Sequence, residues 1–330
     1  MKHLLIVTCF VLAVSSTVAS GAEVLRAGII GCDTSHVPAF TRLINDPDAS
    51  GARAQVEVVV AYPGGSPDLA ESRDRVEEYT EQIRSAGVEI VDSIDKLVER
   101  CDVILIESVD GRVHLDQFRK AARGKPVFID KPAAAALADV LRIGEVAKQT
   151  GTPLFSSSAL RYCESITPLK AAAQKERLLG CTVASPYRIE PTHSDFFWYG
   201  VHGVESLFTL MGTGCEEVRC TETESAAVVV GQWNDGRLAT YRGIKQGKTD
   251  YYFVTFGEQS IAQGRGISGY QPLVEEICKF FVSGKAPVSW DETVEIFTFM
   301  EAAKVSRERN GEPVRLEEIL AKVRKEAGER

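Results

Sequence analysis

Short apolar runs alternate with amphipathic stretches through the first half of the chain. Five runs are continuous enough for strands buried on both faces: residues 25–31, 55–61, 102–106, 125–129 and 152–155. The stretches between them have helical periodicity, at residues 37–44, 68–85, 94–100, 113–123 and 135–149. Strands alternating with helices of this length predict right-handed crossovers and a parallel sheet. We therefore expect an α/β fold with a Rossmann-like nucleotide-binding domain over residues 23–153.

The pattern changes after residue 153. Helical stretches at residues 165–178 and 201–211 precede β-rich runs at residues 217–222, 226–233, 237–244 and 251–256. The turn Asn234-Asp235-Gly236 joins two of these runs as a hairpin, and further helices are predicted at residues 272–282, 291–309 and 316–325. Residues 154–330 should therefore form an α+β substrate and oligomerisation domain with an open, mainly antiparallel sheet. Such a sheet is compatible with a homodimer or homotetramer.

Residues 1–22 have the order of a secretory signal peptide. A basic start with Lys2 precedes an apolar stretch at residues 4–14, and small residues follow. The alternative is a buried N-terminal helix or strand. A Sec-type signal predicts a periplasmic or secreted protein. No other stretch is long and apolar enough for a membrane span, so no membrane contact is expected after cleavage.

Composition and charge exclude some partners. The 330 residues carry a net charge of −8 without a Lys/Arg run, so nucleic acid is not an expected partner. Of eight cysteines, Cys9 lies in the signal segment, and the other seven match no zinc-site spacing. Most should be small buried residues, although Cys215 and Cys220 are close enough in sequence to be considered as a disulfide.

A tight turn should follow the first strand, at the segment from Gly28 through Gly31 to His36. Aligned on the dinucleotide fingerprint G-x-G-x-x-G, Gly31 fits, but Asp33 and His36 replace the other two glycines. A carboxylate ~4 Å from a phosphate costs about 1 kcal/mol in water and several at lower dielectric. No acid follows the second strand, where Tyr62 stands, to bind a ribose. The turn alone leaves open a dinucleotide site or a Rossmann turn without one.

Several later motifs resemble those of a known family. In chain order they are His114, Gly124-Lys125-Pro126-Val127, Asp130-Lys131-Pro132, Arg161-Tyr162, residues 193–205 and residues 283–306. Together they resemble the glucose–fructose oxidoreductase / inositol dehydrogenase / MocA (Gfo/Idh/MocA) family. That family has Glu-Lys-Pro where Asp130 begins the motif here. It also has D-x-G-x-H-x-x-D where Trp198, Gly200, His202 and Glu205 stand, so Gly200 and His202 match and the other two depart.

The resemblance implies a bound NAD or NADP. The residues that would hold it are Gly28, Gly31, Cys32, Asp33, Thr34, Ser35, His36, Tyr62, Ser108, His114, Asp130 and Lys131. Oxidation of a secondary alcohol needs a base and a donor to the developing alkoxide, which suits His202 and Lys131 as catalytic residues. Their structural alternatives are a core histidine and a solvated lysine. The expected substrate-binding residues are Arg161, Trp198, Tyr199 and Glu205.

No metal is expected, because His193, Asp195, His202 and Glu205 match no compact metal-binding spacing. The leading hypothesis is an exported oxidoreductase that acts on a sugar or polyol with tightly bound NAD(P). One alternative is a redox-assisted glycoside hydrolase or lyase that would use the same Lys131 and His202. The other is a non-catalytic sugar-binding module whose cofactor site has degenerated, which Asp33 and His36 favour.

Overall fold

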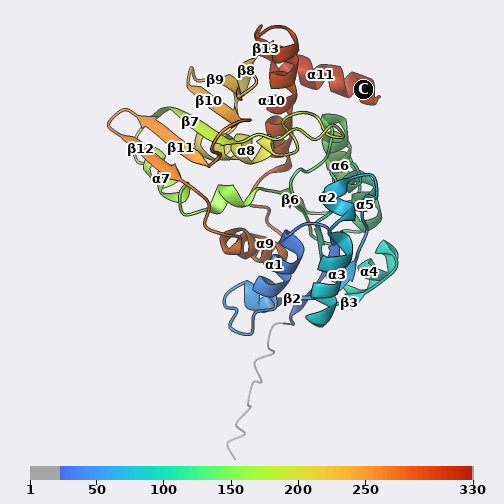
Figure 1. Cartoon of the computed structure of the whole chain (residues 1–330). Coiled ribbons are helices and arrows are strands. Elements are labelled where there is room, and N and C mark those ends of the chain that lie inside the picture. Colours follow the sequence, from blue (N-terminus) through green and yellow to red (C-terminus); the bar gives the residue numbers. More distant parts are fainter. Residues whose placement is uncertain (1–22, 329–330) are drawn as a thin grey trace, which may run out of the picture.

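Two sheets, each with its own helices, make up the part of the chain that a computed structural model describes, residues 23–328 (Figure 1). The predicted signal peptide, residues 1–22, lies outside the described residues. In that range no helix is long and apolar enough to cross a membrane.

The first sheet is parallel throughout, as predicted, with strand order β3-β2-β1-β4-β5-β6. Its strands are β1 (Leu25–Ile30), β2 (Val56–Tyr62), β3 (Glu89–Ile90), β4 (Val103–Ile106), β5 (Val127–Ile129) and β6 (Leu154–Ser156). Its helices are α1 (His36–Ile44), α2 (Ala70–Arg73), α3 (Val76–Ser85), α4 (Ile94–Arg100), α5 (His114–Ala121) and α6 (Leu137–Thr150). The order of connections reverses between β1 and β4, so the carboxyl ends of these strands are where an α/β sheet binds ligands.

The second sheet is mixed, with order β12-β11-β7-β10-β9-β8-β13 and one parallel pair, β7 with β10. Its strands are β7 (Leu178–Pro186), β8 (Cys215–Glu222), β9 (Ala226–Trp233), β10 (Leu238–Ile244), β11 (Tyr252–Gly257), β12 (Ile261–Arg265) and β13 (Val314–Arg315). Helices α7 (Thr167–Ala173), α8 (Gly200–Met211), α9 (Gln271–Ser283), α10 (Trp290–Glu308) and α11 (Leu316–Ala327) complete the domain. The predicted mainly antiparallel α+β domain is confirmed.

Helix α8 packs closely on the second sheet because one residue of its first turns has no side chain. A Cβ on Gly203 would lie 2.2 Å from the Tyr241 ring of β10. Helix α9 returns to the first sheet, where Leu273, Ile277 and Phe280 share an apolar core with Phe40 of α1 (Figure 1). The two sheets are therefore linked by packing as well as by the chain.

Two predicted helices differ from the structure, and one long strand, β7, was not predicted. The helix expected at residues 68–85 is two helices, α2 and α3, and the Ser72 hydroxyl of α2 donates to Asp33 in the turn after β1. The helix expected at residues 165–178 ends at Ala173, and β7 begins at Leu178. Strand β7 lies between β10 and β11, so cross-strand pairing stabilises a segment whose small residues gave no clear strand pattern.

The considered disulfide between Cys215 and Cys220 does not form, since both thiols are free and buried. Both residues lie on β8, five positions apart. At about 3.3 Å per residue they are roughly 16 Å apart, far beyond the reach of a disulfide. All seven cysteines of the described residues are free and buried, as expected for small apolar side chains.

Candidate active site

A cavity of about 340 Å³ opens between the carboxyl edge of the first sheet and the second domain. The first domain contributes the start of α1 and the Lys131-Pro132 turn after β5, and the second contributes Trp198, Tyr199 and His202. The complete lining is Thr34, Ser35, His36, Glu71, Arg75, Val109, Lys131, Pro132, Ala159, Arg188, Trp198, Tyr199, His202, Tyr251, Ile267 and Tyr270. The structure thus brings both predicted catalytic residues, Lys131 and His202, to one cavity.

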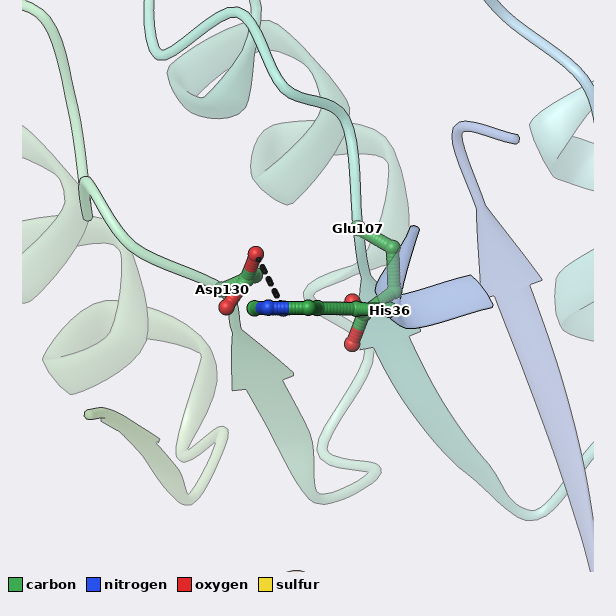
Figure 2. Close-up of side chains that lie close together, drawn as sticks. All are labelled: His36, Glu107 and Asp130. Atoms are coloured by element: carbon green, nitrogen blue, oxygen red, sulfur yellow. Dashed lines mark ion pairs between the residues drawn. The ribbon is translucent and has the colours of Figure 1, made fainter. Parts of the chain in front are cut away.

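Three buried side chains converge on the sheet edge beside this cavity (Figure 2). The Nδ1 of His36 lies 2.9 Å from Oδ2 of Asp130 in an ion pair, and the Lys131 ammonium lies 3.8 Å from the same oxygen. Burial alone would raise the pKa of Asp130, but the charges of His36 and Lys131 lower it to about 2. Burial, followed by the charge of Asp130, raises the pKa of Glu107 well above its usual value.

Glu107 is the residue of this group that the sequence analysis missed. It directly follows β4, and Asp130 directly follows β5, which pairs with β4 through Ile106 and Ile129. Adjacent parallel strands end at the same edge, so the position after each strand was the signal that could have revealed the pair.

The turn after β1 holds Asp33 away from the cavity. Its side chain is completely buried and accepts hydrogen bonds from the Ser72 hydroxyl (2.6 Å) and the Val109 amide (2.8 Å). Burial raises its pKa, and these two hydrogen bonds oppose that rise. The carboxylate therefore binds neighbouring segments together, and the repulsion expected between Asp33 and a pyrophosphate is weakened because the cavity lining does not include it.

Other predicted cofactor residues hold the strand ends in place. Gly31 has φ of +88°, and a Cβ there would lie 2.1 Å from the Ser108 hydroxyl. The buried His114 ring contacts the carbonyl oxygens of Ser108 (2.8 Å) and Ala133 (3.2 Å) through its two nitrogens. His114 therefore joins the loops after β4 and β5.

Of the twelve predicted cofactor residues, four line the cavity and eight do not, among them Gly28, Tyr62 and Cys32. Gly28 lies within β1, where a Cβ would meet Leu97 of α4 at 2.7 Å, so it permits packing of the helix on the sheet. Tyr62 ends β2, and its carbonyl oxygen accepts from the Gly31 amide (2.8 Å). Burial raises the pKa of the Cys32 thiol to about 12, so this cysteine remains protonated and unreactive.

His202 lies in the first turn of α8, and its Nδ1 is 2.7 Å from the Ser158 hydroxyl. That hydroxyl also accepts from the Leu160 amide (3.2 Å). Burial, with the nearby positive charges of Lys131 and His36, lowers the pKa of His202 to about 3. The ring is therefore neutral near neutral pH and can accept a proton or a hydrogen bond.

Arg161 and Glu205, expected at the substrate, do not line the cavity. Both are buried, with Arg161 Nε 3.4 Å from Glu205 Oε2 and its Nη1 2.7 Å from Glu292. Glu205 also accepts from the Ser158 amide (2.8 Å). The pair thus positions Ser158, which in turn contacts His202, so its link to the cavity is indirect.

Trp198 and Tyr199, predicted as stacking platforms for a sugar ring, both line the cavity. The Arg188 guanidinium lies 5.1 Å from the centre of the Tyr199 ring. The Trp198 ring contacts His193, whose Nε2 accepts from the Gly111 amide (3.0 Å). Asp195, the other residue weighed as a ligand, forms an ion pair with Arg307.

The cavity favours anions or polar ligands. Arg75, Arg188 and Lys131 provide its cationic side chains, against the carboxylate of Glu71. Helix α1 begins at the cavity, and its N-cap Ser35 makes no side-chain capping bond. The positive end of the helix dipole therefore faces the same space.

These residues fit a dinucleotide. Gly31, Thr34 and Ser35 would hold a pyrophosphate at the start of α1, with Arg75 as its counter-charge. A wider hollow of about 920 Å³ beside the end of β2 is lined by Pro63, Gly64 and one face of α3. The carboxylates of Glu77, Glu78 and Glu81 on that face could accept from ribose hydroxyls, a role for which the sequence offered no acid after β2.

The chain has a two-domain architecture, in which a Rossmann-like domain with a parallel sheet precedes a domain with a mixed sheet. Residues 25–158 match the Gfo/Idh/MocA model, described as "Oxidoreductase family, NAD-binding Rossmann fold". This part of the chain is therefore similar to the NAD-binding Rossmann domain of that family. No curated protein matches the chain.

Solved structures share the fold over nearly the whole length. A "probable dehydrogenase" from Thermotoga maritima is 20% identical, with a TM-score of 0.73 over 89% of this chain and 100% of its own. The scyllo-inositol dehydrogenase from Lactobacillus casei, solved with NAD(H) and scyllo-inositol, is 13% identical, with a TM-score of 0.72 over 89% and 100%. The myo-inositol dehydrogenase of the same organism, solved with NAD(H) and myo-inositol, is 15% identical, with a TM-score of 0.69 over 89% and 97%. At these identities the likeness concerns the fold.

Proposed function

We propose that the protein is an exported oxidoreductase that transfers a hydride between a sugar or polyol hydroxyl carbon and NAD or NADP. The observation that carries this proposal is the meeting of Lys131 and His202, from two domains, in one cavity with aromatic walls. Sugars and polyols present hydroxyls to such donors and an apolar ring face to aromatic side chains. The inositol dehydrogenases with the same fold are consistent with this substrate class.

His202 and Lys131 would share the proton chemistry. The Ser158 hydroxyl fixes the His202 ring at Nδ1, and a proton on Nδ1 would leave Nε2 free to accept the proton of the substrate hydroxyl. The Lys131 ammonium, 15% exposed and facing the cavity, would donate to the same oxygen as its negative charge develops. A bound dinucleotide would supply the hydride acceptor.

The decisive experiment is release of the cofactor from purified protein by heat, followed by absorbance and mass analysis. We expect NAD or NADP in the supernatant, or a rise in Tm when either is added. Lys131→Met and His202→Asn should fold and lose turnover, while the exposed Lys279→Met serves as the matched control. No released dinucleotide and no Tm change at millimolar NAD or NADP would contradict the proposal.

A second candidate is sugar binding without a dinucleotide. It is favoured by Asp33, whose two hydrogen bonds close the turn that usually stays open to a pyrophosphate, and by His36, which places a ring where the fingerprint has a glycine. Calorimetric binding of a polyol by protein that has been shown to contain and bind no dinucleotide would support this candidate and exclude the first.

We also propose that the open sheet associates with a second copy of the chain. Leu238, Gly180, Phe256 and Ile261 form one row across β10, β7, β11 and β12, and the three apolar side chains are exposed, Ile261 by 72%. Light scattering should show a dimer or tetramer that Ile261→Glu weakens. A monomer at micromolar concentration would contradict this.

Export is proposed from residues 1–22 alone. Processing near residue 22 would leave a mature chain that begins with the β1 segment. N-terminal sequencing of protein from the periplasm or medium should find a start close to residue 23. Full-length protein confined to the cytoplasm would contradict it.

A further inference from the structure

The group formed by His36, Glu107 and Asp130 contains an unusual concentration of unpaired polar atoms. His36 is 6% exposed, and the two carboxylates are completely buried. Five of their atoms, Nδ1 of His36 and all four carboxylate oxygens, have no hydrogen-bond partner among the described residues. The 2.9 Å contact between Nδ1 of His36 and Oδ2 of Asp130 is an ion pair, and it leaves the other carboxylate oxygens without a partner in the described part of the chain.

Burial of such atoms without partners is unfavourable. Each unsatisfied buried group costs about 1–3 kcal/mol, and more when it is charged, so native proteins pair nearly all of them. The adjacent ammonium of Lys131 lies 3.8 Å from one Asp130 oxygen. Within residues 23–328 that ammonium forms no ion pair with Glu107, so a second cation would be needed to satisfy the group.

We propose that His36 Nδ1 and the carboxylates of Glu107 and Asp130 bind a divalent transition-metal ion, Mn²⁺ or Zn²⁺. One ligand atom from each of the three residues lies within 4.8 Å of the others. Ligands 2.0–2.2 Å from one ion are at most about 4.4 Å apart, so small side-chain movements complete the geometry. Figure 2 shows the three side chains close together, Glu107 and Asp130 from the ends of β4 and β5 and His36 from the start of α1.

The donor set selects the type of ion. An imidazole nitrogen favours Zn²⁺, Mn²⁺ and their neighbours over Mg²⁺ and Ca²⁺, which prefer oxygen ligands alone. Two carboxylates neutralise the charge of a divalent ion. The His36 ring is held in place by stacking on Phe40 (5.0 Å) and by the edge of Tyr270 (4.6 Å), as metal-binding histidines usually are held by their surroundings.

The ion would lie beside the substrate cavity. His36 and Lys131 are part of its lining, whereas Glu107 and Asp130 lie behind them. Three protein ligands leave at least one coordination position, as catalytic metal sites do. A hydroxyl or carboxylate oxygen of a small ligand is the chemistry that suits this position.

The test uses the whole purified protein, stripped with a chelator and titrated with Mn²⁺ or Zn²⁺ in a calorimeter. We expect one ion per chain, a rise in Tm and weaker binding of Mg²⁺. Glu107→Gln and Asp130→Asn keep the side-chain shape and should each lower the affinity about 100-fold or more, beyond the 10–100-fold typical of outer-shell partners. Asp33→Asn, an equally buried carboxylate on the same edge, is the matched control and should bind normally.

A direct measurement keeps the proposal testable if the variants do not fold. Pulsed electron paramagnetic resonance of Mn²⁺ bound to wild-type protein should show coupling to an imidazole nitrogen. Three results would contradict the proposed metal site. They are no stoichiometric binding of an ion, unchanged binding in both carboxylate variants, and a bound Mn²⁺ ion without coupling to a nitrogen. Because neither dinucleotide nor sugar is present, failure here is distinct from failure of the proposed oxidoreductase.

Discussion

Acidification should destabilise the protein through the buried imidazole of His193. Its Nε2 accepts a hydrogen bond from the Gly111 amide (3.0 Å), and its Nδ1 lies 2.9 Å from the Thr192 hydroxyl. If Nε2 were protonated, its N–H would point at the Gly111 N–H, and neither group could accept the other's hydrogen bond. Burial lowers the pKa of His193 from 6.5 to about 4, although the Asp110 carboxylate, 3.7 Å away, opposes that change. The folded protein therefore keeps this ring neutral at a pH where the unfolded chain protonates it.

The sign and size of the effect follow from this difference. The contribution of the neutral His193 ring to the free energy of unfolding is fully present above pH 6.5. It declines as the pH falls toward 4, because in this range the unfolded chain binds a proton at His193 and the folded protein does not. A pKa lower by about 2.5, at about 1.4 kcal/mol for each pH unit, corresponds to a loss of about 3 kcal/mol at pH 4. Other groups, His202 among them, also make stability depend on pH. A variant that changes only His193 keeps these groups, so their effect cancels when the two proteins are compared.

The assay compares wild type with His193→Gln, in which the side-chain amide oxygen can still accept from Gly111. Urea unfolding followed by tryptophan fluorescence, at pH 7, 6, 5 and 4, gives the free energy of unfolding of both proteins. The advantage of wild type at pH 7 should shrink by about 3 kcal/mol by pH 4. An advantage that stays constant with pH would show that His193 titrates alike in both states and would refute the reasoning.

Three further outcomes are expected. Arg161→Met should lower the free energy of unfolding by about 3–5 kcal/mol, because it leaves Glu205 buried without its counter-charge; a loss below 1 kcal/mol in urea unfolding would contradict the buried pair. Gly31→Ala should cost about 2–5 kcal/mol from positive φ and the contact at 2.1 Å, so a Tm near that of wild type would count against this geometry. A thiol reagent should leave the native cysteines unmodified and react with all seven of the described residues in denaturant, whereas two unreactive ones would indicate a Cys215–Cys220 bridge.

The pattern of apolar runs was sufficient to predict the parallel sheet, the mainly antiparallel second sheet and most helices. These features depend on local periodicity, which sequence displays directly. The failures depend on contacts distant in sequence. The predicted boundary at residue 153 is too early for the first sheet, because β6 (Leu154–Ser156) pairs with β5. Strand β7 is specified by pairing with β10 and β11, and the break between α2 and α3 is accompanied by a hydrogen bond from Ser72 to Asp33.

The candidate site divides in the same way. Lys131 and His202 could be predicted because each stands in a motif, and the structure places both at the cavity. Arg161 and Glu205 also stand in motifs, yet they pair with each other below the surface, since two buried opposite charges are stable only together. Glu107 stands in no motif, and its importance follows only from the pairing of β4 with β5.

The two departures from the glycine fingerprint have different physical consequences. Asp33 turns inward and links α2 to the loop after β4, so its charge is withdrawn from the cavity. His36 lies at the sheet edge and pairs with Asp130 beside Glu107, so it places an imidazole ring and its Nδ1 at the cavity. A glycine at position 36 would offer neither. If a metal ion binds there, metal coordination explains why histidine replaces glycine at position 36. The ion, in addition to Lys131, would then bind ligand oxygen atoms at this sheet edge. If none binds, the same histidine must be explained by its ion pair with Asp130 alone, and Glu107 remains a buried acid kept neutral by its raised pKa.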